Sequence, residues 1–323
     1  MSYRQLTQEQ RSQIEILLSN NFLQKEIAAQ LGVSAATISR ELSRNKGFTG
    51  YYANVAQANT KQRRAKGGRA GISMFVLDLV EEMLCKDWSP EQISGYLKKN
   101  KNIVISHETI YKHVWANQRA GGTLYTHLRH HRRKHRHRSS GKAGRGCIPN
   151  RVDISERPAV VEQKTRVGDW EGDTIIGKNH KGAILSLVDR HTKFTLLANL
   201  KNKTAAEVLR GIQETCAQIP GALFKTITFD NGKEFSYHEA ITKHLGAACY
   251  FARPYCSSDR GLNEHTNGLV RQYYPKKTSF TQLEDARTQE IADKLNDRPR
   301  KVLGFMSPRE KLMECVAAIA LDP

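Results

Sequence analysis

Trp170-Glu171-Gly172-Asp173 opens a run of apolar segments that continues to Val188-Asp189-Arg190. Residues 173–176, 183–188 and 194–198 are rich in Ile, Leu, Val, Phe and Thr, and turn residues such as 177–180 separate them. Short apolar runs bounded by turn residues are typical of β-strands joined by hairpins. The sequence therefore predicts a three-stranded meander that begins in this segment.

The residues that follow the meander predict alternating helices and strands. An amphipathic helix is expected over 204–219, a strand over 225–229, a short helix over 238–245 and a strand over 248–252. A further helix should begin near Gly261. Three meander strands followed by helix, strand, helix and strand are the order of an α/β sheet of the ribonuclease H-like type.

Three carboxylates fall at informative places in this predicted sheet. Asp173 lies in the first strand, Asp230 ends the fourth strand before an Asn231-Gly232 turn, and Glu264 lies on the helix after Gly261. Two-metal phosphoryl transfer needs carboxylates that converge from different elements. A single acid is usually a surface or capping residue, but the order of these three favours a catalytic, metal-binding triad.

Neighbouring polar residues compete with or support this triad. Asp169 and Glu171 would share a strand face with Asp173, since side chains alternate, yet Asp173 is the preferred catalytic acid. Asp189 ends the second strand and either shapes the hairpin with Arg190 or supports the site from behind.

The helix that carries Glu264 holds further candidates. Asn263 and Asn267 flank the carboxylate and are candidates to orient DNA or a water molecule. Arg271 lies two turns beyond Glu264, about 10 Å along the axis. Its guanidinium is therefore a candidate to hold a DNA phosphate.

The charge of the chain points to a polyanionic partner. Among 323 residues the net charge is +19, and residues 1–150 hold 25 Lys and Arg against 10 Asp and Glu. A solvated basic surface, a ribosome-like role or a membrane-surface role would also fit. Nucleic acid is favoured because the same half carries helix-turn-helix patterns.

Residues 1–46 predict a helix-turn-helix DNA-binding domain. Thr7 and Gln10 form a capping box for the first helix, Gly32 ends the second, and Ser34 caps the third. Small and basic side chains on the third helix are expected to face DNA: Ala36, Thr37, Arg40 and Arg44. The alternative is an ordinary three-helix bundle.

The rest of the basic half divides into three parts. Residues 47–70 are expected to be a basic, partly helical linker, and 71–118 a second helical DNA-binding module that starts one helix at Ser89-Pro90. A spacer or dimerisation module is the alternative for 71–118. Residues 119–160 predict a basic His/Arg-rich linker before the core of residues 161–323. Within it, 127–146 contain five His, eight Lys and Arg and no acid, which favours phosphate contacts over a metal site.

The six cysteines show no paired spacing, so neither a disulfide framework nor a zinc knuckle is expected. The polar N-terminus and the lack of a long apolar run predict no signal peptide and no membrane span. A cytoplasmic, nucleoid-associated bacterial protein is the expectation.

Three motifs resemble one enzyme family. Trp170-Glu-Gly-Asp173, Thr228-Phe-Asp230-Asn-Gly-Lys-Glu-Phe235 and Asn263-Glu264-His-Thr-Asn-Gly-Leu-Val-Arg-Gln-Tyr-Tyr-Pro275 resemble the DDE transposases of insertion-sequence family thirty. Asn296-Asp-Arg-Pro-Arg300 and Ser307-Pro-Arg-Glu310 resemble the tail of retroviral integrase-like cores. The family's recognition segment corresponds to residues 34–45 here, and its second helical region to 88–94 and 106–111.

The resemblance implies a Mg²⁺-dependent DNA transposase, with Mn²⁺ as a substitute, that cuts the ends of its own element and joins the 3′ hydroxyls to target DNA. The expected partners are the terminal inverted repeats and target DNA, bound by a homodimer or a higher oligomer. The rival hypotheses are a sequence-specific DNA-binding regulator and a ribonuclease H-type nuclease that lacks strand transfer.

Overall fold

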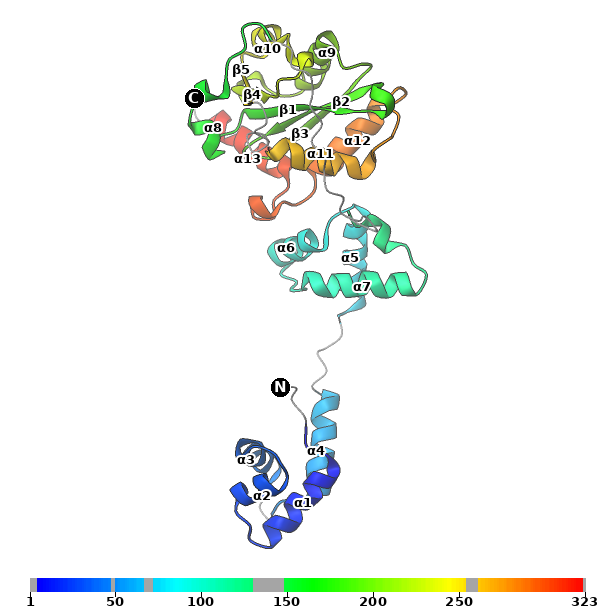
Figure 1. Ribbon diagram of the computed structural model, residues 1–323, viewed down its shortest axis with the longest axis vertical. Coiled ribbons are helices and arrows are strands. Elements are labelled where there is room, and N and C mark those ends of the chain that lie inside the picture. The colour runs from blue at the N-terminus through cyan, green and yellow to red at the C-terminus, as the bar shows by residue number, and fades with distance from the viewer. Residues whose placement is uncertain (1–4, 48–49, 67–71, 130–147, 254–260, 322–323) are drawn as a thin grey trace. The chain divides into compact units, whose positions relative to one another are not determined.

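The computed structural model describes residues 5–47, 50–66, 72–129, 148–253 and 261–321. The chain forms two compact units, residues 1–73 and 74–323 (Figure 1). The expected His-rich tract lies mostly in 130–147, outside the described residues. Within the described ranges, no helix combines the length and the apolar composition needed to cross a bilayer.

The first unit contains four helices: α1 (Gln8–Ser19), α2 (Gln24–Gln30), α3 (Ala35–Asn45) and α4 (Ala53–Lys66). The capping box of Thr7 with Gln10 and the cap of Ser34 on α3 are confirmed. Ile38 and Leu42 of α3 pack into the core, as their spacing predicted.

The prediction of a linker over 47–70 is wrong in part. Helix α4 packs against α1, and Tyr51 and Ala56 belong to the same core as Ile14 and Ile27. Few of the α4 residues are apolar, so local periodicity did not reveal a buried face. The packing is completed instead by long-range polar contacts.

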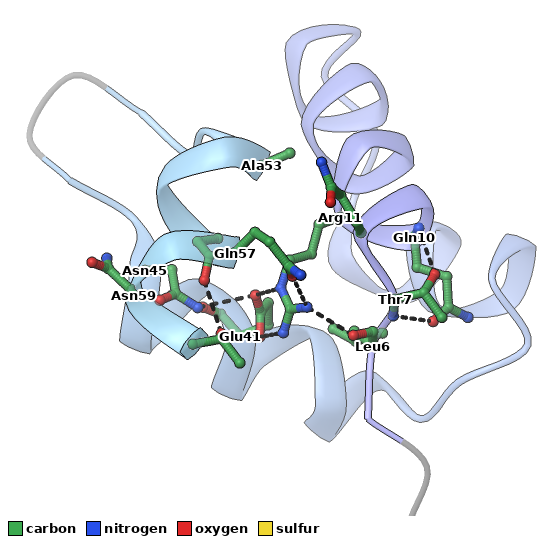
Figure 2. Close-up of polar contacts among 12 residues, drawn as sticks. Leu6, Thr7, Gln10, Arg11, Glu41, Asn45, Ala53, Gln57 and Asn59 are labelled. Atoms are coloured by element: carbon green, nitrogen blue, oxygen red, sulfur yellow. Dashed lines mark hydrogen bonds and ion pairs between the residues drawn. The ribbon is translucent and has the colours of Figure 1, made fainter. Parts of the chain in front are cut away.

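A buried ion pair links three helices of this unit (Figure 2). Arg11 of α1 donates from Nε to Glu41 Oε1 of α3 at 2.8 Å and from Nη1 to Gln57 Oε1 of α4 at 2.8 Å. Tyr51 donates its hydroxyl to the same Glu41 oxygen. Burial and the adjacent Glu41 carboxylate raise the pKa of Tyr51, so this hydroxyl remains a donor.

The second unit begins with a trihelical module: α5 (Met74–Cys85), α6 (Pro90–Lys101) and α7 (His107–Arg119). Ser89 caps α6 with Gln92 in a capping box, as expected. The module extends past the predicted end at 118, because Leu124 and Leu128 pack into its core. The linker predicted over 119–160 is therefore shorter, since Ile148 at its far end is buried in the core of the sheet domain.

The predicted strands form a single sheet, in which they are arranged in the order β3-β2-β1-β4-β5. The strands are β1 (Asp169–Ile176), β2 (Ala183–Asp189), β3 (Thr195–Leu200), β4 (Thr226–Phe229) and β5 (Ala248–Phe251). Strand β2 pairs antiparallel with both β1 and β3. On the other side of β1, β4 pairs parallel with β1, and β5 pairs parallel with β4. The meander and the parallel extension confirm the ribonuclease H-like α/β prediction.

Helices cover both faces of this sheet (Figure 1). The elements are α8 (Val160–Gln163), α9 (Ala205–Cys216), α10 (His238–Leu245), α11 (Gly261–Tyr273), α12 (Asp285–Asn296) and α13 (Pro308–Leu321). Val208 and Ile212 of α9 share a core with Leu185 and Leu187 of β2. On the opposite face, α11 and α12 pack against Ile175, Ile184 and Leu197. The helix that carries Glu264 therefore lies on the face to which the odd-numbered residues of β1 point.

Candidate active site

Asp173 lies in β1, and Asp230 directly follows the neighbouring strand β4. The parallel register pairs Glu171 with Thr228, so two residues further along, Asp173 lies level with Asp230. Adjacent strands are about 4.8 Å apart. The pairing of two carboxylates that the sequence separates by more than fifty positions thus follows from the β1–β4 register.

The position directly before Asp173 is occupied by Gly172 and has no room for a side chain. A Cβ at this position would lie 2.4 Å from the Phe229 ring of β4. Phe229 is fully buried and stacks on Phe235. The close approach of β1 and the Phe229 ring therefore requires glycine, and it holds the strand that bears Asp173 beside the end of β4.

The carboxylate of Asp230 is oriented by the turn after β4. Its Oδ1 accepts a hydrogen bond from the Gly232 N–H at 2.9 Å. Asn231 donates from its side chain to the Ala252 carbonyl at 2.7 Å, which fixes the turn against the end of β5. The Asp-Asn-Gly segment thus forms a hydrogen-bonded turn that holds Asp230 at the carboxyl end of a buried strand.

Asn267 binds Asp173, the first of the three candidate carboxylates, directly. Its Nδ2 donates to Asp173 Oδ2 at 2.7 Å, and its Oδ1 accepts from Ser186 Oγ at 2.8 Å. Ser186 is the cross-strand partner of Asp173. Asn267 therefore connects α11 to Asp173 and to β2, and its orientation of DNA or a water molecule stays a prediction.

Glu171 ties the start of α11 to the same strand. Its Oε2 accepts the backbone N–H of Asn263 at 3.0 Å, and its Oε1 lies 3.0 Å from Arg190 Nη1. The side chains of Glu171 and Arg190 are 2% and 3% exposed. Since the first N–H groups of a helix have no partner within the helix, Glu171 acts as a remote cap for the turn that contains Glu264.

Sequence reasoning missed this role of Glu171, which it considered as a rival catalytic acid. Glu171 lies two residues before Asp173, which correctly predicted that both side chains point to the same face of β1. No local sequence signal, however, connects residue 171 with residue 263. Asp169 is also structural: it is fully buried, pairs with Arg166 at 2.8 Å and accepts from Thr226 Oγ1. Of these three acids of β1, only Asp173 is partly exposed.

Asp189 belongs to the β2–β3 turn. It accepts hydrogen bonds from the backbone N–H groups of Gly168, His191 and Thr192. Burial raises its pKa, while these hydrogen bonds act in the opposite direction. Asp189 pairs with Trp170, so it lies three residues beyond Ser186, the position opposite Asp173. Asp189 was expected either to shape the hairpin or to support the site, and its contacts fit the first of these roles.

Arg271 and Asn263 have placements that the sequence did not indicate. Arg271 donates from Nη2 to the Ile176 carbonyl at 2.8 Å and lies over the Phe280 ring. Asn263 is fully buried, and its side-chain amide has no hydrogen-bond partner among the described residues. The contact of Arg271 with a DNA phosphate stays a prediction, and its observed contacts join α11 to the end of β1.

The three acids differ in exposure, with Glu264 exposed and both aspartates intermediate. Among the described residues, no group of three His, Cys, Asp or Glu side chains is close enough together to hold a metal ion. The three acids nevertheless suit a hard divalent cation, because all of them supply carboxylate oxygens. Two of them, Asp173 and Asp230, lie on the neighbouring segments β1 and the end of β4.

The predicted DNA-facing residues lie on the surface of the first unit. On α3, Ala36, Arg40 and Arg44 are exposed, and Thr37 is partly exposed. Arg40 donates from Nε to the Ala36 carbonyl at 3.1 Å. These side chains share the helix surface opposite the buried Ile38 and Leu42. The arrangement is that of a recognition helix with a small, basic outer face.

Two family models match the chain. A helix-turn-helix domain matches residues 2–45, and an integrase core domain matches residues 165–257. The transposase for insertion sequence element IS4351 of Bacteroides fragilis is 42% identical over 97% of both chains. The transposase InsI for insertion sequence element IS30A of Escherichia coli K12 is 36% identical over 97% of this chain and 84% of its own length.

A further relative extends the comparison. The transposase for insertion sequence element IS1086 of Cupriavidus metallidurans is 34% identical over 98% of this chain and 96% of its own length. These similarities span both the helix-turn-helix unit and the ribonuclease H-like sheet, in agreement with the motifs at Asp173, Asp230 and Glu264. The chain therefore belongs to insertion-sequence family thirty (IS30) of the DDE transposases, with the catalytic core of a polynucleotidyl transferase.

Proposed function

We propose that this transposase binds the terminal inverted repeats of its insertion sequence, cuts the ends and transfers the 3′ hydroxyls to target DNA, with Asp173, Asp230 and Glu264 as ligands for Mg²⁺. The supporting observation is the joint placement of Asp173 and Asp230 on one sheet edge, with α11 tied to β1 on both sides of Glu264. Mn²⁺ would satisfy the same oxygen ligands.

Two bound divalent cations would activate the attacking oxygen and stabilise the leaving oxygen. The protein's own contribution is to hold the carboxylates in position. Asn267 fixes one oxygen of Asp173, the Gly232 N–H fixes one oxygen of Asp230, and Glu171 holds the first turn of α11. Water is the nucleophile for cutting and the freed 3′ hydroxyl for joining, so no side chain forms a covalent link.

The catalytic assignment is tested by Glu264→Gln, which keeps the shape of the side chain and removes its charge. We expect cutting and joining of an end-bearing duplex with Mg²⁺ to fall by at least about 10³-fold, because a metal ligand that acts only in the reaction is lost. Binding to the same duplex should be unchanged. Glu290→Gln is the matched control, since Glu290 is an exposed acid on the neighbouring helix α12.

Wild-type rates for Glu264→Gln would show that the triad is assigned wrongly. The wild-type protein itself separates the rival functions. Cutting without joining would identify a nuclease, and specific binding without either reaction would identify a regulator.

The recognition assignment is tested by Arg40→Ala. We expect affinity for the element end to fall by about 1–3 kcal/mol, and affinity for a random duplex of equal length to fall less, because a base contact carries sequence information. Fluorescence anisotropy with both duplexes at one salt concentration measures the difference. Lys25→Ala, an exposed cation on α2, is the control. Equal losses on both duplexes would make Arg40 a phosphate contact.

A further inference from the structure

Two segments of the second unit that are far apart in the sequence bring arginines close to α11, the helix that carries Glu264: one segment holds Arg129, the other Arg298 and Arg300. Positions 265, 268 and 272 share one face of α11, since they are spaced by three and four residues. A Cβ at Gly268 would lie 2.8 Å from Nη2 of Arg129, so this guanidinium rests against the helix backbone. Arg298 Nη1 donates to Gln272 Oε1 at 3.3 Å, one turn further along.

The third member, Arg300, follows Arg298 in the segment after α12. Its Nη2 donates to the Leu295 carbonyl at 2.9 Å. Arg298 is 3% exposed, and the Nε atoms of both residues are buried without a hydrogen-bond partner among the described residues. The other two nitrogens of Arg298 donate to Gln272 and to the Tyr273 hydroxyl. Each unpaired Nε leaves hydrogen-bonding capacity that the described residues do not use.

Acidic side chains do not balance this cluster. Among ion pairs between described residues, these three arginines take part in one, between Arg298 and Asp87 at 3.9 Å. Asp87 is also 3.0 Å from His127. Burial lowers the pKa of Arg129, and nearby Arg298 adds to the effect. Burial also lowers the pKa of Arg300 to about 10, with Arg298 and Arg129 as further causes.

A pKa of about 10 leaves Arg300 protonated at neutral pH, so the cluster carries its full positive charge. Like charges held together in a partly buried place repel one another, and a bound anion relieves that repulsion. Solvent reaches the cluster on the side of Arg129, because Arg129 is partly exposed and His265, on the same face of α11 as Gly268, is exposed.

The position of the cluster suggests which anion it takes. Gly268 is one helical turn from Glu264, about 6 Å along the axis, which corresponds to the rise of about two nucleotides in a DNA strand. Arg129 also belongs to the 127–146 tract, which contains eight Lys and Arg and no acid. A polymer with a phosphate at every nucleotide fits both the cluster and the tract.

We propose that Arg129, Arg298 and Arg300 form a binding site for a backbone phosphate of DNA, within about two nucleotides of the bond that is cut. The proposal rests on the transposase function above and extends it to residues from two segments that are far apart in the sequence. It assigns the segment 298–300 and the end of the trihelical module a shared role in holding the substrate strand.

The test measures DNA affinity of the full-length protein without divalent cations, so that no cutting occurs. Arg129→Gln removes one charge, and Gly268→Ala displaces the Arg129 guanidinium while the net charge stays the same. For both variants we expect the slope of log K against log salt to become shallower by about 0.9, the value for one lost phosphate contact. Between 50 and 200 mM salt, the wild type should then lose about 3.5-fold more affinity than either variant.

The control is Arg287→Gln, which also removes one positive charge, from an exposed arginine paired with Glu290 on α12. We expect its slope to equal that of the wild type. Random and end-bearing duplexes should be affected equally by Arg129→Gln, because a phosphate contact reads no sequence. Gly268→Ala keeps the test valid if Arg129→Gln fails to fold.

An unchanged slope in both variants, or a loss confined to the end-bearing duplex, would overturn the proposal. So would stabilisation of the wild type alone by inorganic phosphate, with no variant effect on DNA affinity, since the site would then bind a free anion. The result is independent of the catalytic test. A shallower slope together with wild-type cutting by Glu264→Gln would retain the phosphate site and reject the triad.

Discussion

Single side chains of this protein are placed by partners far away in the sequence. Glu171 shows this most clearly, because its carboxylate contacts Asn263, ninety-two positions further along, and the buried Arg190. A carboxylate buried at 1% exposure beside a guanidinium is costly to remove, since the remaining charge is left in a low-dielectric environment. Its neighbour Asp173, two residues further along, is partly exposed.

We therefore predict that Glu171→Ala lowers the free energy of unfolding by roughly 3–5 kcal/mol, the typical effect of breaking a buried pair from one side. Glu171→Gln should lose less, because it keeps an acceptor for the Asn263 N–H. Urea unfolding followed by circular dichroism measures both. The control is Glu162→Gln, whose side chain is 65% exposed and pairs with the same Arg190. A loss within about 1 kcal/mol for Glu171→Ala would contradict the capping role.

Individual elements of the chain follow local sequence signals closely. The caps at Thr7, Ser34 and Ser89 were each predicted from a hydroxyl side chain before a helical pattern, and each accepts the expected backbone N–H. Such signals act within three residues, so no tertiary information is needed. Helix α4 is the exception, because its stabilising contacts come from Arg11 of α1 and from Tyr51.

The role of α4 leads to a prediction about fragments. We expect a peptide of residues 1–73 to fold cooperatively, and one of residues 1–46 to be largely unfolded at 25 °C. The shorter peptide lacks Tyr51, Ala56 and Gln57, which contact the Glu41–Arg11 pair or complete the core. Circular dichroism during thermal unfolding measures the difference. A cooperative transition in the 1–46 fragment would show that α4 is dispensable, as the linker interpretation implied.

At the scale of the whole molecule, charge and catalytic machinery are divided along the chain. The basic half holds the helix-turn-helix unit and the trihelical module, and the remaining residues form the sheet and its helices. The arginine cluster combines residues from both parts of the chain, since Arg129 belongs to the basic half and Arg298 and Arg300 belong to the sheet domain. This arrangement would place non-specific phosphate affinity next to the carboxylates, where a strand must be held for reaction.

The sequence by itself determined the strands, the capped helices, the ribonuclease H-like order and the positions of Asp173, Asp230 and Glu264 on their elements. These features depend on alternation, capping and turn chemistry, which act over a few residues. Tertiary structure alone decided that Glu171 caps α11, that Asn267 holds Asp173, that α4 belongs to the first core and that Arg129 lies against Gly268. Each of these joins residues dozens of positions apart, and strand register and helix packing, rather than local propensity, determine which distant side chains come into contact.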